Sequence, residues 1–315
     1  MPPIKIENEG HLKALHARYF TVSRLGSLYG EGFTSKWQEY QHMRGALPFP
    51  ELNNKILERG TRMQVIARPW IMDKKPDWTV SDCSDMYPHP AIERFAASPD
   101  LILWRDGNMG CGEVKVVNSM AWKNDWANGD NPPLRVELQL QGQIACAGAT
   151  WGAIIAIVIG TFEFEMHIFE RDRRPKTIAK IETDVQKFLD DVANGNEPPV
   201  DYANDAEAIA EMYRDSTPGK TVDMSDSDRL PILCSRDLEL KTIQAATEKE
   251  RKAIKAEIFE AANDAEEIKV GNFRIKAGLT KSQPDKIISV DDIGMVIKGR
   301  AGYRQCLITE GKQHE

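Results

Sequence analysis

The amino-acid sequence predicts a mixed α/β fold, in which a central sheet is flanked by helices, from three observations. Short β-like runs separated by Pro, Gly and Asp fill residues 78–116. The unbroken apolar run 151–159 is typical of a buried strand. Residues 174–195 carry apolar side chains at helical spacing, with Pro175 at the start, and the sequence GNEPP ends them.

The other elements of this core follow in chain order. Residues 10–70 are expected to be mainly helical, with breaks at YGEGF and ALPFP, and residues 123–133 are expected to be a loop. A second strand is predicted over 162–169, where apolar and polar side chains alternate. Its apolar positions are Phe162, Phe164, Met166 and Ile168.

The chain is expected to have two parts. Residues 1–200 form the predicted core, and residues 201–315 form a C-terminal appendage with an acidic connection, a charged helix at about 238–265 and two or three short strands. Thr247 and Glu250 interrupt the apolar stripe of that helix, so a long coiled coil is not expected.

Composition narrows the class of protein. Five cysteines without CxxC spacing favour a reducing cytosol over a disulfide framework, a zinc site or an iron–sulfur cluster. The longest apolar run, 152–160, is too short to cross a membrane, and no secretory signal is recognised. We therefore expect a cytoplasmic protein with no membrane partner. The net charge of −7 falls mostly in residues 201–240, so it does not exclude a local basic surface for nucleic acid.

Charged residues interrupt the segment AASPDLILWRDGNMGCGEVKVVNS, residues 96–119. Glu113 and Lys115 share one face of a strand, and the turn RDGNMG can bring Asp100 beside Glu113. One interpretation is an ordinary strand with a solvated polar face. The other is a pocket in which a hard divalent cation relieves the repulsion of two carboxylates, with the lysine beside the attacking water. From spacing alone both stay open.

The order Pro99–Asp100, Glu113–x–Lys115 is also the signature of the PD-(D/E)XK nuclease superfamily, and the chain resembles its YqaJ-type viral recombinases, the relatives of lambda exonuclease and RecE. Over residues 10–200, six segments occur in the family's order. They read HARYFTVSRLGSLYG, ERGTRMQVIA, HPAIERFAASPD, GCGEVKVV, PPLRVELQLQ and IFERD. The resemblance implies a restriction-endonuclease-like fold for this part of the chain.

The resemblance also implies a metal site. Asp100, Glu113 and the backbone carbonyl of Val114 would be ligands of Mg²⁺, with Mn²⁺ as a possible substitute. Lys115 would position the hydrolytic water and stabilise charge on the phosphoryl oxygens, and Gln139 would assist it.

Further positions would surround that metal site. Gln141, the second glutamine of the pair, would support it from behind. Ser98 and Ser23 are candidate phosphate contacts, and Arg18 is the candidate for a 5′-phosphate, with His16 as its neighbouring possibility.

The sequence departs from the family pattern at three positions. Gln64 replaces the helix glutamate that helps to hold a second metal, Leu101 replaces a Gly, and Val136 replaces a Tyr. Gln64 matters most because an amide oxygen can coordinate a cation but carries no charge. It implies slower catalysis, a single metal, a different ligand or an inactivated copy.

The implied function is a Mg²⁺-dependent DNA exonuclease of a phage or prophage recombination system. It would degrade one strand from a duplex end, 5′→3′, and leave a 3′ overhang for a single-strand annealing protein. The family's ring-shaped oligomers suggest a homo-oligomer. The alternatives are a restriction-like endonuclease on the same core and a non-catalytic DNA-end-binding protein; an iron–sulfur nuclease is disfavoured by the dispersed cysteines.

Two other groups have alternative interpretations. Trp122 and Trp126 could stack on unpaired bases or pack their loop onto the domain. The basic run ERDRRPK, with Arg171, Arg173 and Arg174, is interpreted as a solvated helix start rather than a DNA-backbone contact.

Overall fold

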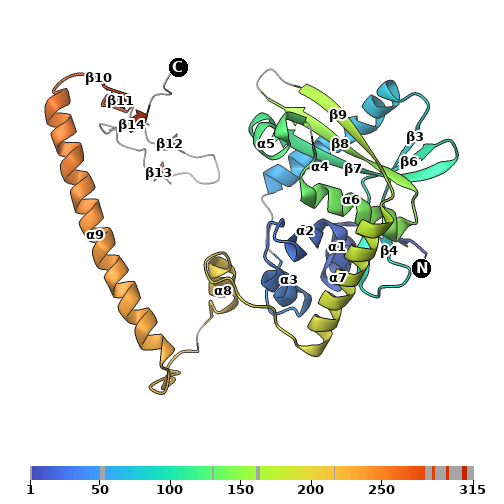
Figure 1. Ribbon diagram of the computed structural model, residues 1–315, viewed down its shortest axis with the longest axis horizontal. Helices are drawn as coiled ribbons and strands as arrows, with labels where there is room; N and C mark the ends of the chain where they lie inside the picture. The colour runs from blue at the N-terminus through green and yellow to red at the C-terminus, as the bar shows by residue number, and fades with distance from the viewer. Residues whose placement is uncertain are drawn as a thin grey trace. The chain divides into compact units, whose positions relative to one another are not determined.

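The computed structural model describes residues 2–49, 54–129, 131–160, 164–215, 217–280, 286–287, 296–297 and 307–310 (Figure 1). The chain divides into two compact units, Met1–Pro218 and Gly219–Glu315. The first unit ends beyond the predicted boundary at residue 200. The buried carboxylate of Asp205 accepts a hydrogen bond from Gln38 Nε2 at 2.9 Å, which attaches the segment after the last core helix to the unit.

A five-stranded mixed sheet forms the centre of the first unit, in the order β3-β6-β7-β8-β9. The β7–β8 pair is parallel, and the other three pairs are antiparallel. Both strands predicted beyond residue 150 are present, although Phe162 lies outside the described residues. The strands span Thr79–Asp82 (β3), Leu101–Arg105 (β6), Asn108–Asn118 (β7), Trp151–Ile159 (β8) and Phe164–Asp172 (β9).

Helices cover both faces of this sheet (Figure 1). Helix α4 (Asn54–Lys74) packs Ala67 and Ile71 on one face, against Val114 and Ile155 among others. Helix α6 (Leu134–Ala147) packs on the other face, with α5 (Ser119–Asp125) and η2 (Ala127–Gly129) beside it. The predicted mixed α/β class, a central sheet flanked by helices, is confirmed for this unit.

Burial on both faces changes one interpretation. Val114 faces the α4 side, whereas Cys111 and Val117 face α6, so Glu113 on that second face is only 3% exposed. The interpretation of Glu113 as part of a solvated strand face is therefore wrong, because α6 covers that face.

The β6–β7 hairpin sets the register of the candidate site. Its two-residue turn, Asp106–Gly107, has positive φ at both positions, 50° and 74°. Such a turn follows the right-handed twist of the strands, and Asp-Gly adopts it with little strain. In the resulting register Leu101 pairs with Gly112, and the Asp100 amide donates to the Gly112 carbonyl. Asp100 consequently lies opposite Glu113.

Two well-delimited helices hold the α6 side. Helix α7 (Pro175–Asn194) has Pro at its start and ends at Gly195, whose φ is 75°. Helix α6 ends in the same way at Gly148, with φ of 69°. Glycine reaches this left-handed conformation without the steric cost of a Cβ atom. The predicted apolar stripe of α7 is buried, at Ile178, Ile181, Val185, Phe188, Leu189 and Val192.

The N-terminal segment adds a second, four-stranded sheet in the order β1-β4-β5-β2. Phe20, Phe95 and Phe188 form the centre of its core. Strand β5 runs directly into the Ser98–Pro99–Asp100 segment, so this sheet helps to position the first carboxylate. The elements span Ile4–Lys5 (β1), Glu9–Arg18 (α1), Phe20–Thr21 (β2), Val22–Arg24 (η1), Leu25–Leu28 (α2), Lys36–Met43 (α3), Asp85–Pro88 (β4), Phe95–Ala97 (β5) and Ala206–Met212 (α8).

The second unit contains a long helix and short strands. Helix α9 (Arg229–Ala262) begins earlier than the predicted charged helix and includes most of it. Antiparallel strands follow at Glu267–Val270 (β10), Phe273–Lys276 (β11), Lys286–Ile287 (β12), Val296–Ile297 (β13) and Leu307–Glu310 (β14). None of the helices in the described part of the chain is long and apolar enough to span a membrane.

Gly142 of α6 allows close packing of the N-terminal segment. A Cβ atom there would lie 2.8 Å from Leu25 Cδ1 and 2.8 Å from Val22 Cγ1. We expect Gly142→Ala to lower the free energy of unfolding by about 1–3 kcal/mol, because a packed core tolerates an added methyl poorly. Urea unfolding measures this change. The control is Gly60→Ala in α4, where nothing lies within 4 Å and a gain of about 0.5–1 kcal/mol is expected. Equal effects at both sites would contradict the packing argument.

Candidate active site

Asp100 lies at the start of β6 and is fixed by two hydrogen bonds. Its Oδ2 accepts from the backbone N–H of Val114 at 2.8 Å, and its Oδ1 accepts from Gln64 Nε2 at 3.0 Å. The first bond crosses the hairpin and the second comes from α4. Three elements thus hold this carboxylate in one orientation.

Glu113 and Lys115 form an ion pair on the α6-facing side of β7. Glu113 Oε1 lies 2.6 Å from Lys115 Nζ, and Glu113 Oε2 accepts from Gln143 Nε2 at 2.5 Å. Lys115 Nζ also donates to Gln139 Oε1 at 3.0 Å. The predicted group Asp100, Glu113, Lys115 and Gln139 is therefore brought together, although its catalytic role stays a prediction.

Gln141 does not join this group. Its Nε2 donates to the Asp172 carbonyl at 3.0 Å, and its Oε1 accepts from the Arg174 backbone N–H at 2.9 Å. Two residues of helix turn a side chain about 200° away from Gln139, so these glutamines lie on opposite sides of α6. Gln141 joins α6 to the start of α7, and within the described residues no hydrogen bond links it to the carboxylates or to Lys115, so its support of the site from behind stays a prediction.

Gln143 is the residue that the sequence analysis missed. It is fully buried, and it lies four residues after Gln139, which places both on one stripe of α6. Its Oε1 is buried without a hydrogen-bond partner among the described residues. The spacing of the three glutamines in QLQGQ contains the signal, because in a helix the first and third share a face and the second does not.

Two carboxylates lie close together in the site with Lys115 as their positively charged neighbour, and this arrangement shifts the pKa values. Burial, and then the charge of Glu113, raise the pKa of Asp100 to about 8. Burial alone would lower the pKa of Lys115, but the charge and hydrogen bond of Glu113 and the charge of Asp100 raise it above its ordinary value. Lys115 is therefore an ammonium at neutral pH, and Asp100 resists ionisation.

The donor set fits a hard divalent cation. Carboxylate oxygens are the ligands that Mg²⁺ prefers, and a second positive charge would relieve the repulsion that raises the pKa of Asp100. Val114 adds a backbone carbonyl between Glu113 and Lys115. Within the described residues no three His, Cys, Asp or Glu side chains converge on one point, so backbone, amide or water oxygens would complete the coordination.

The predicted phosphate contacts have different surroundings. Ser98 Oγ is buried and has no hydrogen-bond partner among the described residues, two positions before Asp100. Ser23 is exposed in η1 and contacts Thr21 Oγ1 at 2.9 Å. Arg18 ends α1, is exposed and lies over the Tyr19 ring at 5.7 Å. No hydrogen bond within the described part of the chain links Ser23 or Arg18 to the carboxylates.

The two tryptophans and the basic run ERDRRPK, each with two interpretations above, mainly pack or bond within the domain. Trp126 is buried and stacks on Trp122 at 5.5 Å, as expected for packing of their loop. Arg171 Nε donates to Glu137 Oε1 at 2.6 Å, and Arg173 donates to the Ile144 and Ala149 carbonyls at the end of α6. Arg171 thus connects β9 to α6, whereas Arg173 and Arg174 are exposed and directly precede α7, as expected for a solvated helix start.

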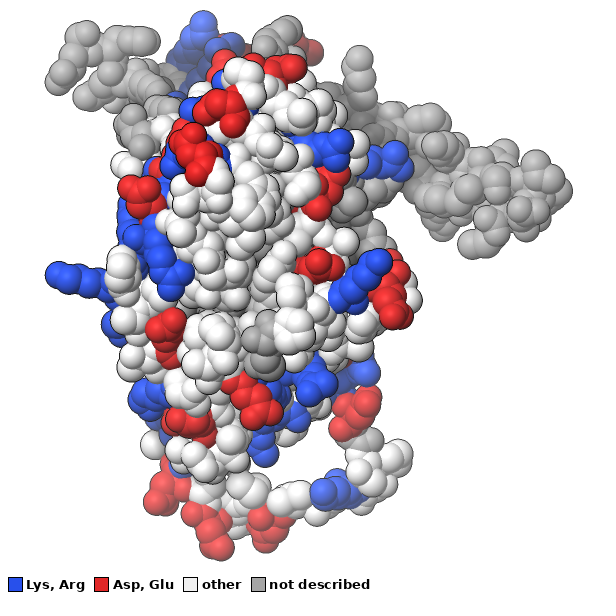
Figure 2. Space-filling view, turned by 90° about the vertical axis from the view of Figure 1, so that its right-hand side faces the viewer, with Lys and Arg blue, Asp and Glu red and all other residues white. Residues whose placement is uncertain are grey.

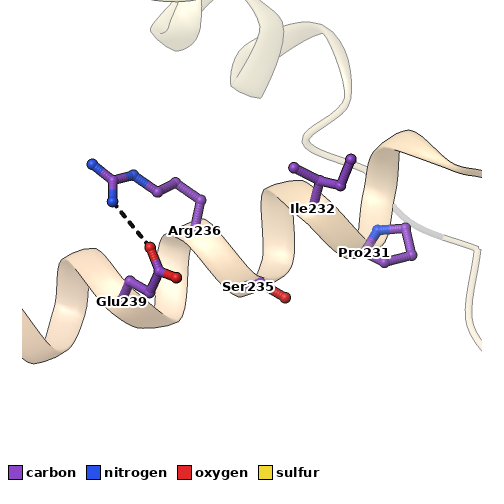
Figure 3. A pocket seen from close by; sticks show the side chains of 5 residues that line it. All are labelled: Pro231, Ile232, Ser235, Arg236 and Glu239. Atoms are coloured by element: carbon purple, nitrogen blue, oxygen red, sulfur yellow. Dashed lines mark hydrogen bonds and ion pairs between the residues drawn. The ribbon is translucent and has the colours of Figure 1, made fainter.

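A shallow hollow on α9 is not a comparable site. All its lining residues belong to that one helix, and Arg236 forms an ion pair with Glu239 at 3.0 Å within it (Figure 3). No set of polar groups converges there, whereas the carboxylates of β6 and β7 do converge. The lining residues are Pro231, Ile232, Ser235, Arg236 and Glu239.

The face shown in Figure 2 carries no continuous basic surface. On the face in Figure 2, Lys and Arg alternate with Asp and Glu around a broad area that carries neither. Any contact with phosphate on that face must therefore depend on individual basic side chains.

Comparison with known proteins gives a likeness of fold. No protein-family model matches the chain, and no curated protein matches it. Solved structures similar to it include the alkaline exonuclease LHK-Exo from Laribacter hongkongensis, 21% identical with a TM-score of 0.49, covering 59% of this chain and 93% of that chain. LHK-Exo in complex with dAMP is 22% identical, with a TM-score of 0.49 and coverage of 60% and 94%. A phage-related exonuclease from Haemophilus somnus 129PT is 12% identical, with a TM-score of 0.41 and coverage of 58% and 99%.

The raised pKa of Asp100 predicts a pH-dependent cost in stability. A carboxyl whose pKa is raised in the folded state stabilises the fold below its ordinary pKa, and this contribution is lost as pH rises towards about 8. We expect Asp100→Asn to stabilise the protein in EDTA, with a gain that grows from pH 5 to pH 9 and reaches on the order of 2 kcal/mol. Thermal unfolding across this pH range measures it. The exposed Asp77 provides the control, Asp77→Asn, and a gain independent of pH would contradict the argument.

Proposed function

We propose that the chain is a metal-dependent deoxyribonuclease that digests DNA from duplex ends. The observation that carries the proposal is the direct bonding of Lys115 to both Glu113 and Gln139, beside Asp100 on the paired strand. A structural role alone would not favour burying two carboxylates side by side, because each loses hydration and repels the other.

Asp100, Glu113 and the Val114 carbonyl would hold Mg²⁺, or Mn²⁺ in its place, and the Gln64 amide oxygen is a further candidate ligand. When bound, the cation would polarise the scissile phosphate and make the attacking water more acidic. Gln64 now presents its NH₂ group to Asp100, because a carboxylate only accepts. Gln64 would have to rotate its amide before it could coordinate.

The chain's own groups would orient the reactants. Lys115 carries a positive charge where charge develops on the phosphoryl oxygens, and Gln139 Oε1 fixes the direction of its ammonium group. Gln143 holds Glu113 from behind. Ser98 Oγ is buried and has no partner in the described structure, so it would have to become accessible before it could donate to a phosphate oxygen. Ser23 and Arg18 would contact phosphates farther along the strand.

The finer function rests on the sequence resemblance. By that resemblance the enzyme degrades one strand 5′→3′ and leaves a 3′ single-stranded overhang. It serves a phage or prophage recombination system in the cytoplasm of a bacterial host. A single-strand annealing protein would receive the overhang, and a ring-shaped homo-oligomer would encircle the duplex. A restriction-like endonuclease on the same core is the alternative that needs no free end.

A second candidate function is favoured by Gln64. With its amide bonded to Asp100, the site has two carboxylates where the family pattern has three. A protein with this weaker cation site could bind DNA ends and cleave slowly or not at all.

Cleavage of end-labelled linear duplex and of a covalently closed circle tests the main proposal. With Mg²⁺ we expect only the linear form to shorten, and EDTA to stop the reaction. Lys115→Ala is expected to lower the rate by about 10²–10³-fold, because it removes a charge directed at the transition state. Lys187→Ala, on the exposed side of α7, is the control and should leave the rate unchanged.

Three results would contradict the exonuclease. Digestion of the closed circle would indicate an endonuclease. Full activity of Lys115→Ala would remove Lys115 from the site. Tight binding to ends without cleavage by the wild type would favour the end-binding protein.

Gln64→Glu tests how the cation site is limited. A third carboxylate beside Asp100 should lower the melting temperature in EDTA and tighten Mg²⁺ binding by on the order of tenfold, because affinity rises with the number of charged ligands. The rise in melting temperature with Mg²⁺ concentration gives the dissociation constant. Gln64→Met removes the amide without adding charge and is the matched control. Unchanged Mg²⁺ affinity in Gln64→Glu would exclude position 64 as a ligand.

A further inference from the structure

An exposed aromatic ring lies near the candidate active site. Phe33 is 95% exposed, in the loop between α2 and α3. Few large apolar side chains are so fully hydrated, and burying this ring would be favourable. No function assigned so far to the site uses it.

The loop that carries Phe33 is fixed to the domain. Thr34 Oγ1 donates to Glu39 Oε1 at 2.6 Å and lies 2.9 Å from Ser27 Oγ. Gly32 approaches Ser27 so closely that a Cβ atom would clash with it. The loop therefore holds the backbone on both sides of Phe33 in a defined place, which lowers the cost of ordering the loop when a ligand binds.

Arg135 connects this ring to the site. Its guanidinium lies 5.4 Å from the centre of the Phe33 ring. Arg135, Gln139 and Gln143 are four residues apart along α6, so they share one stripe, and each step rises about 6 Å. Gln139 contacts Lys115. The Phe33–Arg135 pair consequently lies about one helical turn from the group that would face the scissile phosphate.

Arg135 has donors available for a ligand. Its side chain is 30% exposed, and its one ion pair within the described residues, with Asp125 Oδ2, is long at 3.5 Å. A guanidinium has five N–H donors in a fixed fork, which suits a phosphate. A flat apolar ring beside such a fork matches a nucleotide better than an apolar peptide, because the guanidinium would remain unpaired against the peptide.

We propose that Phe33 and Arg135 form a nucleotide-binding site next to the cleavage centre, in which a base stacks on Phe33 and its phosphate pairs with Arg135. The inference rests on the proposed nuclease function. Adjacent phosphates of a strand are spaced on the scale of one helical turn of α6, so the site would hold a nucleotide adjacent to the scissile bond. It would stabilise a base that has left the duplex stack.

DNA binding by fluorescence anisotropy tests this site in a Lys115→Ala background, which keeps the strand intact. The DNA is a short duplex in Mg²⁺, with an abasic residue moved through the last four positions of each strand. Phe33→Ala should weaken binding at least fivefold with an unchanged slope of log Kd against log salt, and Phe33→Trp should restore it. Arg135→Gln should reduce that slope by about 0.7–0.9. Tyr202→Ala, another exposed aromatic of the same unit, is the control.

The abasic scan identifies the contact. At one position of the DNA, the abasic residue should weaken binding by the Lys115→Ala parent. The same abasic residue should not weaken binding further when Phe33→Ala is also present. The inference is overturned if Phe33→Ala binds every duplex as Tyr202→Ala does, or if it changes only the sedimentation coefficient, which would assign Phe33 to a contact between copies of the chain. If the parent binds no DNA, the proposed function fails, and this inference fails with it.

Discussion

The candidate site depends on the forced proximity of two carboxylates, of which Glu113 is buried and Asp100 is half-buried. The Asp106–Gly107 turn fixes a register in which Asp100 lies opposite Glu113, and α6 covers that face of β7 so that Glu113 loses its water. Burial and repulsion together raise the pKa of Asp100, and the groups around it compensate only in part. Val114 donates a backbone hydrogen bond to Asp100, and Lys115 supplies an ammonium that pairs with Glu113. A bound cation, as proposed above, would complete this compensation.

Much of this arrangement is predictable from the sequence. The apolar run of β8, the stripe and caps of α7, and the Asp-Gly hairpin are local patterns, and local physics determines them. The pairing of Asp100 with Glu113 follows from the hairpin alone. The burial of Glu113 does not follow from the hairpin, because it requires α6. That helix begins 21 residues after Glu113 and reaches β7 only through tertiary packing. The same holds for Phe33, whose contact with Arg135 joins two segments 100 residues apart.

Gln64 shows how a site can favour stability over cation affinity. Its amide donates to Asp100 and so stabilises that carboxylate when no cation is present. A glutamate there would add a third negative charge beside two carboxylates that already repel each other. Without a cation this charge would lower the stability of the fold, and with a cation it would strengthen cation binding. The same substitution thus acts in opposite directions on the two states.

Helix α6 turns these separate contacts into one unit. Arg135, Gln139 and Gln143 lie along one stripe that passes from solvent to the fully buried core, and they contact Phe33, Lys115 and Glu113 in turn. The opposite stripe contains Gln141, which joins α6 to β9 and α7. Because a helix keeps its stripes in fixed relation, a displacement of α6 would change the contacts of Arg135, Gln139 and Gln143 together. Close packing at Gly142 against Val22 and Leu25 opposes such a displacement, so the precision of the site depends on a residue that contacts none of its charged groups.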